Sequence, residues 1–249
     1  MTGTPDLTSS DIIAAAEALP RWRTGGASPY GSSTMLVDRG HAAGLVLLGH
    51  SSAGWYATYY ENHHTYRKEL LEATSPFYDD GIYSEMAKMG VPDPLTILFP
   101  PDDPASTLRQ IEQMRDQELL ADSTVRRFRD QLAEALRECL AAPGDPWEST
   151  GSLDAPGGGY VQWTRVDEIG TPVHIEVSDG SDYSEPLDPQ MVRLLVELGW
   201  QAPDEEFRNA WTRAQRPDDI ARATALVATT LVVALGTETW RLTWDRLTG

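Results

Sequence analysis

A short segment in the first quarter of the chain carries the residue types of a nucleophilic serine site. Gly-His-Ser-Ser-Ala at positions 49–53 follows an apolar run, residues 44–48, that is typical of a strand. In α/β-hydrolases, a strand that runs into a strained turn exposes the central serine of such a motif for attack on an acyl carbon. A serine hydrolase that acts through Ser51 is therefore one hypothesis for the function.

Three features argue against this hydrolase. The last position of the motif is Ala53, where the hydrolase pattern has glycine. The motif should lead into a helix, but residues 55–60 are aromatic and β-prone. The only histidine late in the chain, His174, falls in the middle of a predicted strand rather than on a loop. The pattern favours a plain turn between two strands at Ser51.

Other reactive residue types do not combine into a site. His63 and His64, beside Glu61 or with residues 79–80, resemble metal ligands in type, but adjacent histidines point in different directions on a strand or a helix. The glycines at 157–159 precede a strand, whereas glycine-rich loops that hold phosphate precede a helix. We expect no catalytic residue, no metal and no cofactor.

The chain is strongly acidic. Its formal net charge of −18 disfavours nucleic acid and anionic membranes as partners, because both are negatively charged. Residues 143–206 contain fourteen Asp and Glu and two Arg, a net charge of −12, whereas residues 207–249 contain four acidic and six basic residues, a net charge of +2. The acidic region is either a solvated face or a surface that attracts basic segments of a client.

The single cysteine, Cys139, cannot form an intramolecular disulfide, and this suits the reducing cytoplasm. Its place on the apolar stripe of a predicted helix indicates a buried thiol. The N-terminal residues lack the basic start and apolar stretch of a signal peptide. No apolar run reaches the roughly 18 residues of a membrane span, so we expect no transmembrane helix.

Apolar periodicity and turn residues predict an α+β fold, with helices packed on an antiparallel sheet and two sub-domains, residues 1–120 and 121–249. Helices are expected at residues 11–19, 66–73, 82–89, 105–120, 125–140, 189–198 and 217–235. Strands are expected at residues 34–37, 44–48, 55–60, 95–99, 160–163 and 173–177. Ser9 or Ser10 is the expected cap of the first helix. Asp188 caps the helix that ends at Gly199, whose left-handed turn folds Trp200 back onto it.

Alternation along two of these strands separates a core face from an outer face. The apolar residues that should share one core are Val161, Trp163, Val173, Ile175 and Val177. The residues left on the opposite face are Gln162, Thr164, His174 and Glu176. On this face His174 is expected to be an ordinary surface residue.

The second half of the chain resembles a known family. A helix ends in Leu-Gly-Trp-x-x-Pro at 198–203, Asn209 and Trp211 follow, and an Ala- and Leu-rich helix covers 223–235. With the two preceding strands, these features resemble the YbjN/type III secretion chaperone-like proteins of actinobacteria, the TY-chaperone group. The resemblance covers residues 123–247. It implies a small α+β domain, often a homodimer, that binds peptides and has no catalytic residues.

The leading hypothesis is a non-enzymatic, cytoplasmic, chaperone-like protein. Its client would be a peptide or protein, basic or amphipathic, bound through Gln162, Thr164, His174 and Glu176. The alternative is a regulatory or toxin-linked interaction protein without chaperone activity, and the serine hydrolase is the third hypothesis. The N-terminal half resembles no family.

Overall fold

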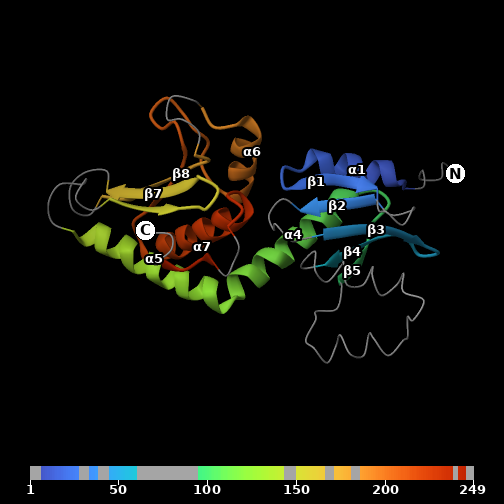
Figure 1. The fold of residues 1–249 in the computed structure, drawn as a ribbon, viewed down its shortest axis with the longest axis horizontal. Coiled ribbons are helices and arrows are strands. Elements are labelled where there is room, and N and C mark those ends of the chain that lie inside the picture. The colour runs from blue at the N-terminus through green and yellow to red at the C-terminus, as the bar shows by residue number, and fades with distance from the viewer. Residues whose placement is uncertain are drawn as a thin grey trace. The chain divides into compact units, whose positions relative to one another are not determined.

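The computed structural model describes residues 7–27, 34–38, 45–60, 95–142, 150–165, 171–180, 186–237 and 241–244. The chain divides into two compact units, Met1–Gln113 and Met114–Gly249. Each contains helices and one antiparallel sheet, so the predicted α+β class is confirmed (Figure 1). The helices expected at 66–73 and 82–89, and the residues 61, 63–64 and 79–80 considered as metal ligands, lie outside the described residues.

The N-terminal unit is built on a five-stranded sheet whose strands are neighbours in chain order. The strands are β1 (Trp22–Ala27), β2 (Thr34–Asp38), β3 (Leu45–Ser51), β4 (Gly54–Tyr60) and β5 (Leu95–Leu98). Helix α1 (Ser9–Ala18) packs along β1 and β2, and the first part of α4 (Pro104–Ala121) adds Leu108 and Ile111 to the same core. The buried Trp22 indole N–H donates to Glu112 Oε1 at 2.6 Å, which ties β1 to α4.

The start of α1 differs from the expectation. Thr8, rather than Ser9 or Ser10, is the N-cap residue, and its hydroxyl accepts the Asp11 N–H at 3.3 Å. The Asp11 carboxylate accepts the Thr8 N–H at 2.9 Å in return, which completes a capping box. The side-chain and backbone hydrogen bonds from Thr8 lower the pKa of Asp11.

The turn that contains Ser51 is a β-hairpin. Strands β3 and β4 pair from Leu45–Tyr60 to Ser51–Gly54, so only Ser52 and Ala53 join them. Ser51 Oγ accepts the Ala53 N–H at 3.2 Å and donates to Gly54 O at 3.4 Å. The predicted turn between two strands is confirmed, and the strand-to-helix geometry of a hydrolase nucleophile is not found there.

The C-terminal unit is a four-stranded sheet in the order β6-β7-β8-β9. The strands are β6 (Gly151–Asp154), β7 (Tyr160–Arg165), β8 (Val173–Ser178) and β9 (Ala210–Ala214). Helices α5 (Ser123–Ala141) and α7 (Pro217–Val233) pack against each other and against one face of the sheet (Figure 1). Helix α6 (Pro189–Leu198) contacts α7 and β9.

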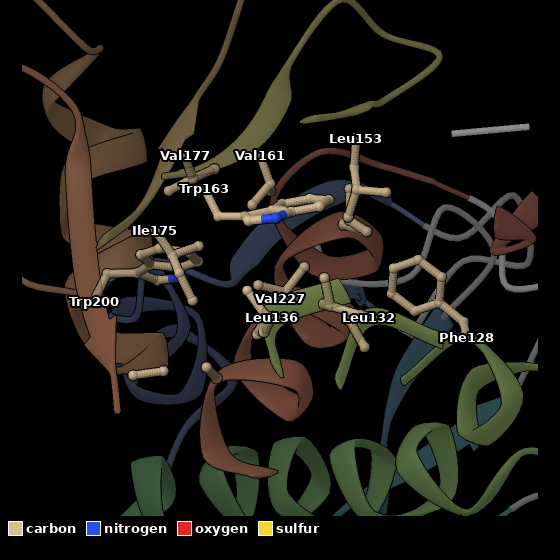
Figure 2. Packing of buried hydrophobic residues seen from close by; sticks show 14 of the residues in the cluster. Phe128, Leu132, Leu136, Leu153, Val161, Trp163, Ile175, Val177, Trp200 and Val227 are labelled. Atoms are coloured by element: carbon tan, nitrogen blue, oxygen red, sulfur yellow. The ribbon is translucent and has the colours of Figure 1, made fainter. Parts of the chain in front are cut away.

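The core of this unit lies between the sheet and the α5–α7 pair. Figure 2 shows Val161 and Trp163 of β7 and Leu153 of β6 facing the side chains of the two helices. The helix residues labelled there are Phe128, Leu132 and Leu136 of α5 and Val227 of α7. All five predicted core residues on β7 and β8 are buried, and so is Cys139. The alternation rule therefore placed the core face of this sheet correctly.

The predicted ends of α6 are confirmed. Asp188 Oδ1 accepts the Gln190 N–H at 2.6 Å, and Gly199 has φ 114° in the left-handed region. The Trp200 N–H then donates to Leu195 O at 3.0 Å, and its indole N–H donates to the Thr230 hydroxyl at 2.8 Å. Trp200 is 2% exposed, so it anchors the chain to α7 where α6 ends.

Three strands were not expected from the sequence: β1, β6 and β9. Strand β1 includes Gly25 and Gly26, and β6 begins at Gly151, although glycine usually marks a break in a sequence-based prediction of strands. Among the helices in the part of the chain that the structure describes, none is long and apolar enough to cross a bilayer.

Candidate functional site

The face of the C-terminal sheet opposite α5 and α7, called the outer face below, carries polar and aromatic side chains in two cross-strand rows. In one row Gln162 pairs with Glu176, which pairs with Trp211. The neighbouring row is Thr164, His174 and Arg213. Residues directly opposite on antiparallel strands are close enough to interact, so each row is a continuous line of contacts.

Glu176 is the hydrogen-bonding centre of the outer face. Its Oε2 accepts from Gln162 Nε2 at 3.2 Å and from Asn209 Nδ2 at 3.0 Å, and its Oε1 lies 2.9 Å from His174 Nε2. The hydrogen bond from His174 is the largest cause that lowers the pKa of Glu176. Because these partners occupy both carboxylate oxygens, Glu176 organises its neighbours rather than projecting a free charge.

His174 lies on the predicted face but is not a surface residue. It is 3% exposed, so the interpretation of His174 as an ordinary surface side chain is wrong. The reason is aromatic cover: the Phe207 ring stacks on the imidazole with centroids 4.0 Å apart, and the Trp211 ring lies 5.6 Å away. His174 Nδ1 is buried and has no hydrogen-bond partner among the described residues.

Residues 201–209, called the cover segment below, bring Phe207 over the sheet. The segment begins with a single antiparallel pair at the free edge of β9, where Gln201 N donates to Trp211 O at 2.8 Å. Inside it, Asp204 Oδ1 accepts the N–H groups of Glu206 at 2.9 Å and Phe207 at 2.8 Å. These bonds close a turn, and the one from Phe207 is the largest cause that lowers the pKa of Asp204.

An exposed cation lies on this aromatic surface. The Arg213 guanidinium carbon is 5.0 Å from the Trp211 ring centroid and 5.8 Å from that of Phe207. The two rings are in turn 5.3 Å apart and tilted by 49°. Phe207 and Trp211 are half-buried, whereas Arg213 is exposed. Part of each ring therefore remains accessible, with a cation beside it.

The structure brings together the four residues that the sequence assigned to the site. Gln162, His174 and Glu176 form one hydrogen-bonded group, and Thr164 lies at its margin, where its hydroxyl accepts from Thr150 Oγ1 at 3.0 Å. Sequence reasoning missed the aromatic and cationic part of the same surface: Phe207, Asn209, Trp211 and Arg213. The available sequence signal was the two-residue alternation in Ala-Trp-Thr-Arg-Ala at 210–214. It indicates a strand that places Trp211 and Arg213 on the face opposite the buried Ala210 and Ala214.

This arrangement has the chemistry of a binding surface. Half-buried aromatic rings beside a cation accept apolar and aromatic side chains, and such residues are common at recognition sites. Within the described ranges no group of three or more His, Cys, Asp or Glu side chains could hold a metal ion.

The C-terminal half of the chain matches a known protein family. Residues 121–243 match the family model TY-Chap3, described as T3SS (YopN, CesT) and YbjN peptide-binding chaperone 3. These residues belong to the TY-Chap3 family. The TY-Chap3 domain thus begins at the end of α4 and contains α5, the four-stranded sheet, α6 and α7. The outer face and the cover segment lie wholly within it.

The resemblance inferred from the sequence is confirmed for the C-terminal half of the chain. No curated protein and no solved structure matches the chain significantly.

Proposed function

We propose that the C-terminal domain, residues 121–249, binds extended peptide segments of client proteins on its outer face, as a chaperone-like module without catalysis. The observation that carries this proposal is the aromatic surface of Phe207 and Trp211 beside Arg213, within a family described as peptide-binding chaperones. Gln162, Thr164, His174 and Glu176 form the framework beneath it. The single cysteine, Cys139, is buried and has no second cysteine to form a disulfide with, which is consistent with a cytoplasmic location.

The client chemistry follows from charge and shape. An apolar or aromatic side chain of the client packs against the half-buried Trp211 ring on the outer face, and the neighbouring carboxylates of Asp204, Glu205 and Glu206 are exposed. Basic residues that flank the apolar side chain are attracted to these carboxylates over about 8 Å at physiological salt. The client is therefore a basic, amphipathic segment.

A synthetic peptide tests the proposal directly. The probe is the seven-residue peptide Lys-Thr-Val-Phe-Thr-Val-Lys, acetylated, amidated and labelled, called the Phe peptide below. Fluorescence anisotropy with the full chain is expected to show saturable binding. Trp211→Ala should weaken it by about 10-fold or more, as for aromatic residues that dominate an interface. The control is Val196→Ala, which removes a 47% exposed apolar side chain on α6. Equal affinities for the wild type and Trp211→Ala would contradict the proposal.

The charge component has its own test. The double variant Glu205→Lys/Glu206→Lys should weaken binding of the Phe peptide and reduce its dependence on salt, because the attraction between opposite charges is lost. Affinity of the wild type should fall between 50 and 300 mM NaCl, concentrations that shorten the screening length from roughly 14 to 6 Å. An affinity that does not change with salt would show that the basic residues flanking the apolar side chain of the client do not contribute to binding.

Chaperoning and regulation differ in what binding achieves. A chaperone-like protein should reduce light scattering when a chemically unfolded basic protein is diluted into buffer, and Trp211→Ala should not. Peptide binding without any effect on aggregation would instead support the alternative of a regulatory interaction protein.

A further inference from the structure

The cover segment occupies the outer face in the manner of an extended ligand. At the open edge of β9, Gln201 pairs with Trp211 through two backbone hydrogen bonds of 2.8 and 3.1 Å. Six residues later, Phe207 places its ring on His174, and Asn209 reaches Glu176 at 3.0 Å. Backbone pairing at a sheet edge with a side chain inserted on the sheet surface is also how extended peptides bind to sheets.

The cover segment is anchored by buried residues at its two ends, and most of the residues between them are exposed. Trp200, before it, is buried in the core, and Ala210, after it, is fully buried in β9. Between them Ala202, Asp204, Glu205, Glu206 and Arg208 are exposed. The turn closed by Asp204 uses atoms of the segment itself, since Asp204 N also donates to Phe207 O at 2.8 Å. If the turn leaves the sheet, its internal hydrogen bonds persist, whereas the contacts of Asp204 with the Trp211 side chain and the Arg213 charge are lost together with the Phe207 stack on His174.

Beneath Phe207, one ring nitrogen of His174 lacks a hydrogen-bond partner among the described residues. Nε2 faces a carboxylate oxygen of Glu176, which only accepts, so Nε2 carries the hydrogen. In the neutral ring Nδ1 is then an acceptor, and it is buried without a partner among the described residues. The Phe207 ring stacks on the face of this imidazole and has no donor in its side chain to offer Nδ1. An occupant that brings an aromatic ring and a nearby N–H or hydroxyl would satisfy the site better than Phe207 does.

We propose that Phe207 is a built-in occupant of the peptide site, and that an aromatic residue of the client displaces it from His174. The client ring stacks on the imidazole, a neighbouring N–H or hydroxyl of the client donates to His174 Nδ1, and the client backbone pairs with β9 in the place of Gln201. The partner is thus an extended segment with an aromatic residue next to a hydrogen-bond donor. This inference rests on the proposed peptide-binding function.

Removal of the built-in occupant is the test. Phe207→Ala should bind the Phe peptide about 5- to 10-fold more tightly than the wild type, because the competing closed state is lost. The same peptide with Ala in place of Phe should bind weakly to both proteins. Val196→Ala is the matched control and should leave the affinity of the Phe peptide unchanged. Circular dichroism and amide NMR spectra show whether each variant is folded.

A second measurement uses the wild type alone. The chain contains four phenylalanines, and selective labelling should resolve the Phe207 ring, whose signals the neighbouring His174 and Trp211 rings should shift. Addition of the Phe peptide should move these signals toward the values of a free phenylalanine and shift the His174 Nδ1 resonance. This readout holds even if Phe207→Ala does not fold.

The possible results distinguish the displacement of Phe207 from peptide binding itself. Binding by the wild type that Phe207→Ala weakens or leaves unchanged, with Phe207 signals that stay in place, would overturn the displacement and leave peptide binding intact. Absence of binding to both proteins would overturn the proposed function and the inference together.

Discussion

The side chains on the two faces of the C-terminal sheet are covered in different ways. The inner face is covered by α5 and α7, and its side chains Val161, Trp163 and Ile175 pack in an apolar core. On the outer face Phe207 of the cover segment stacks on His174, and buried and half-buried polar groups share hydrogen bonds around Glu176. The inner face therefore stabilises the domain by removing apolar area from water, whereas the outer face leaves the aromatic rings of Phe207 and Trp211 half-buried and Arg213 exposed.

This difference predicts that the largest loss of stability comes from the inner side of the sheet. Trp200→Ala should reduce the free energy of unfolding by about 3 kcal/mol or more, as for large buried aromatic residues. It removes a 2% exposed side chain and its hydrogen bond to Thr230. Urea unfolding measures the effect, and Val196→Ala, on the exposed side of α6, should change stability by less than about 0.5 kcal/mol. An unchanged midpoint for Trp200→Ala would show that Trp200 is not an anchor.

The hydrogen-bonded centre of the outer face should be the next most sensitive position. Glu176→Gln leaves one carbonyl oxygen for donors from Gln162, His174 and Asn209. Unpaired groups in a partly buried site cost about 1 to 3 kcal/mol, and we expect a loss in this range from urea unfolding. The control is Glu134→Gln on the exposed side of α5, where the paired Arg137 is also exposed. Equal effects of the two substitutions would show that the outer face contributes no more than ordinary surface.

The same carboxylate gives a pH dependence. The pKa of Glu176 is lowered from its ordinary value of 4.5, chiefly by the hydrogen bond from His174. The unfolded state therefore binds the proton more readily, so the ionised group stabilises the fold above about pH 4.5, and this stabilisation is lost as the pH falls below that value. Unfolding curves between pH 3 and 7 should converge for the wild type and Glu176→Gln at the acid end. Parallel curves across the range would contradict this assignment.

The smallest effect on stability is expected at the exposed edge of the aromatic surface. Arg213→Ala removes a cation that is exposed and stacked at 5.0 Å from the Trp211 ring centroid. Its effect on the free energy of unfolding should stay below about 1 kcal/mol, the range of exposed cation–π contacts. Affinity for the Phe peptide should nevertheless change, since the contact belongs to the proposed binding surface. A large loss of stability would mean that the outer face is part of the core.

The sequence predicted one face of this sheet well and the other only in part. Strict alternation at Val161, Trp163 and Val173 identifies the core side because a strand has a period of two. The same rule places His174 on the opposite side but carries no information on what covers it. Its cover comes from Phe207, thirty-three residues later, through a turn that only the folded chain creates.

The missed edge strands have a related cause. Strand β6 has a single buried apolar residue, Leu153, and begins at a glycine that sequence rules treat as a break. The structure requires that glycine, since a Cβ at Gly151 would lie 2.2 Å from the Trp163 ring across the strand pair. Strand β9 is bounded by two small buried residues, Ala210 and Ala214, so its apolar signal is weak.

The central claim is that clients bind on the outer face, and amide NMR with the Phe peptide tests it most directly. The account predicts that the largest chemical-shift changes occur at Glu176, Phe207, Trp211 and Arg213, and that the amides of α5 remain close to their starting positions. Changes concentrated in the N-terminal sheet or around Val196 of α6, with the outer face unaffected, would contradict it.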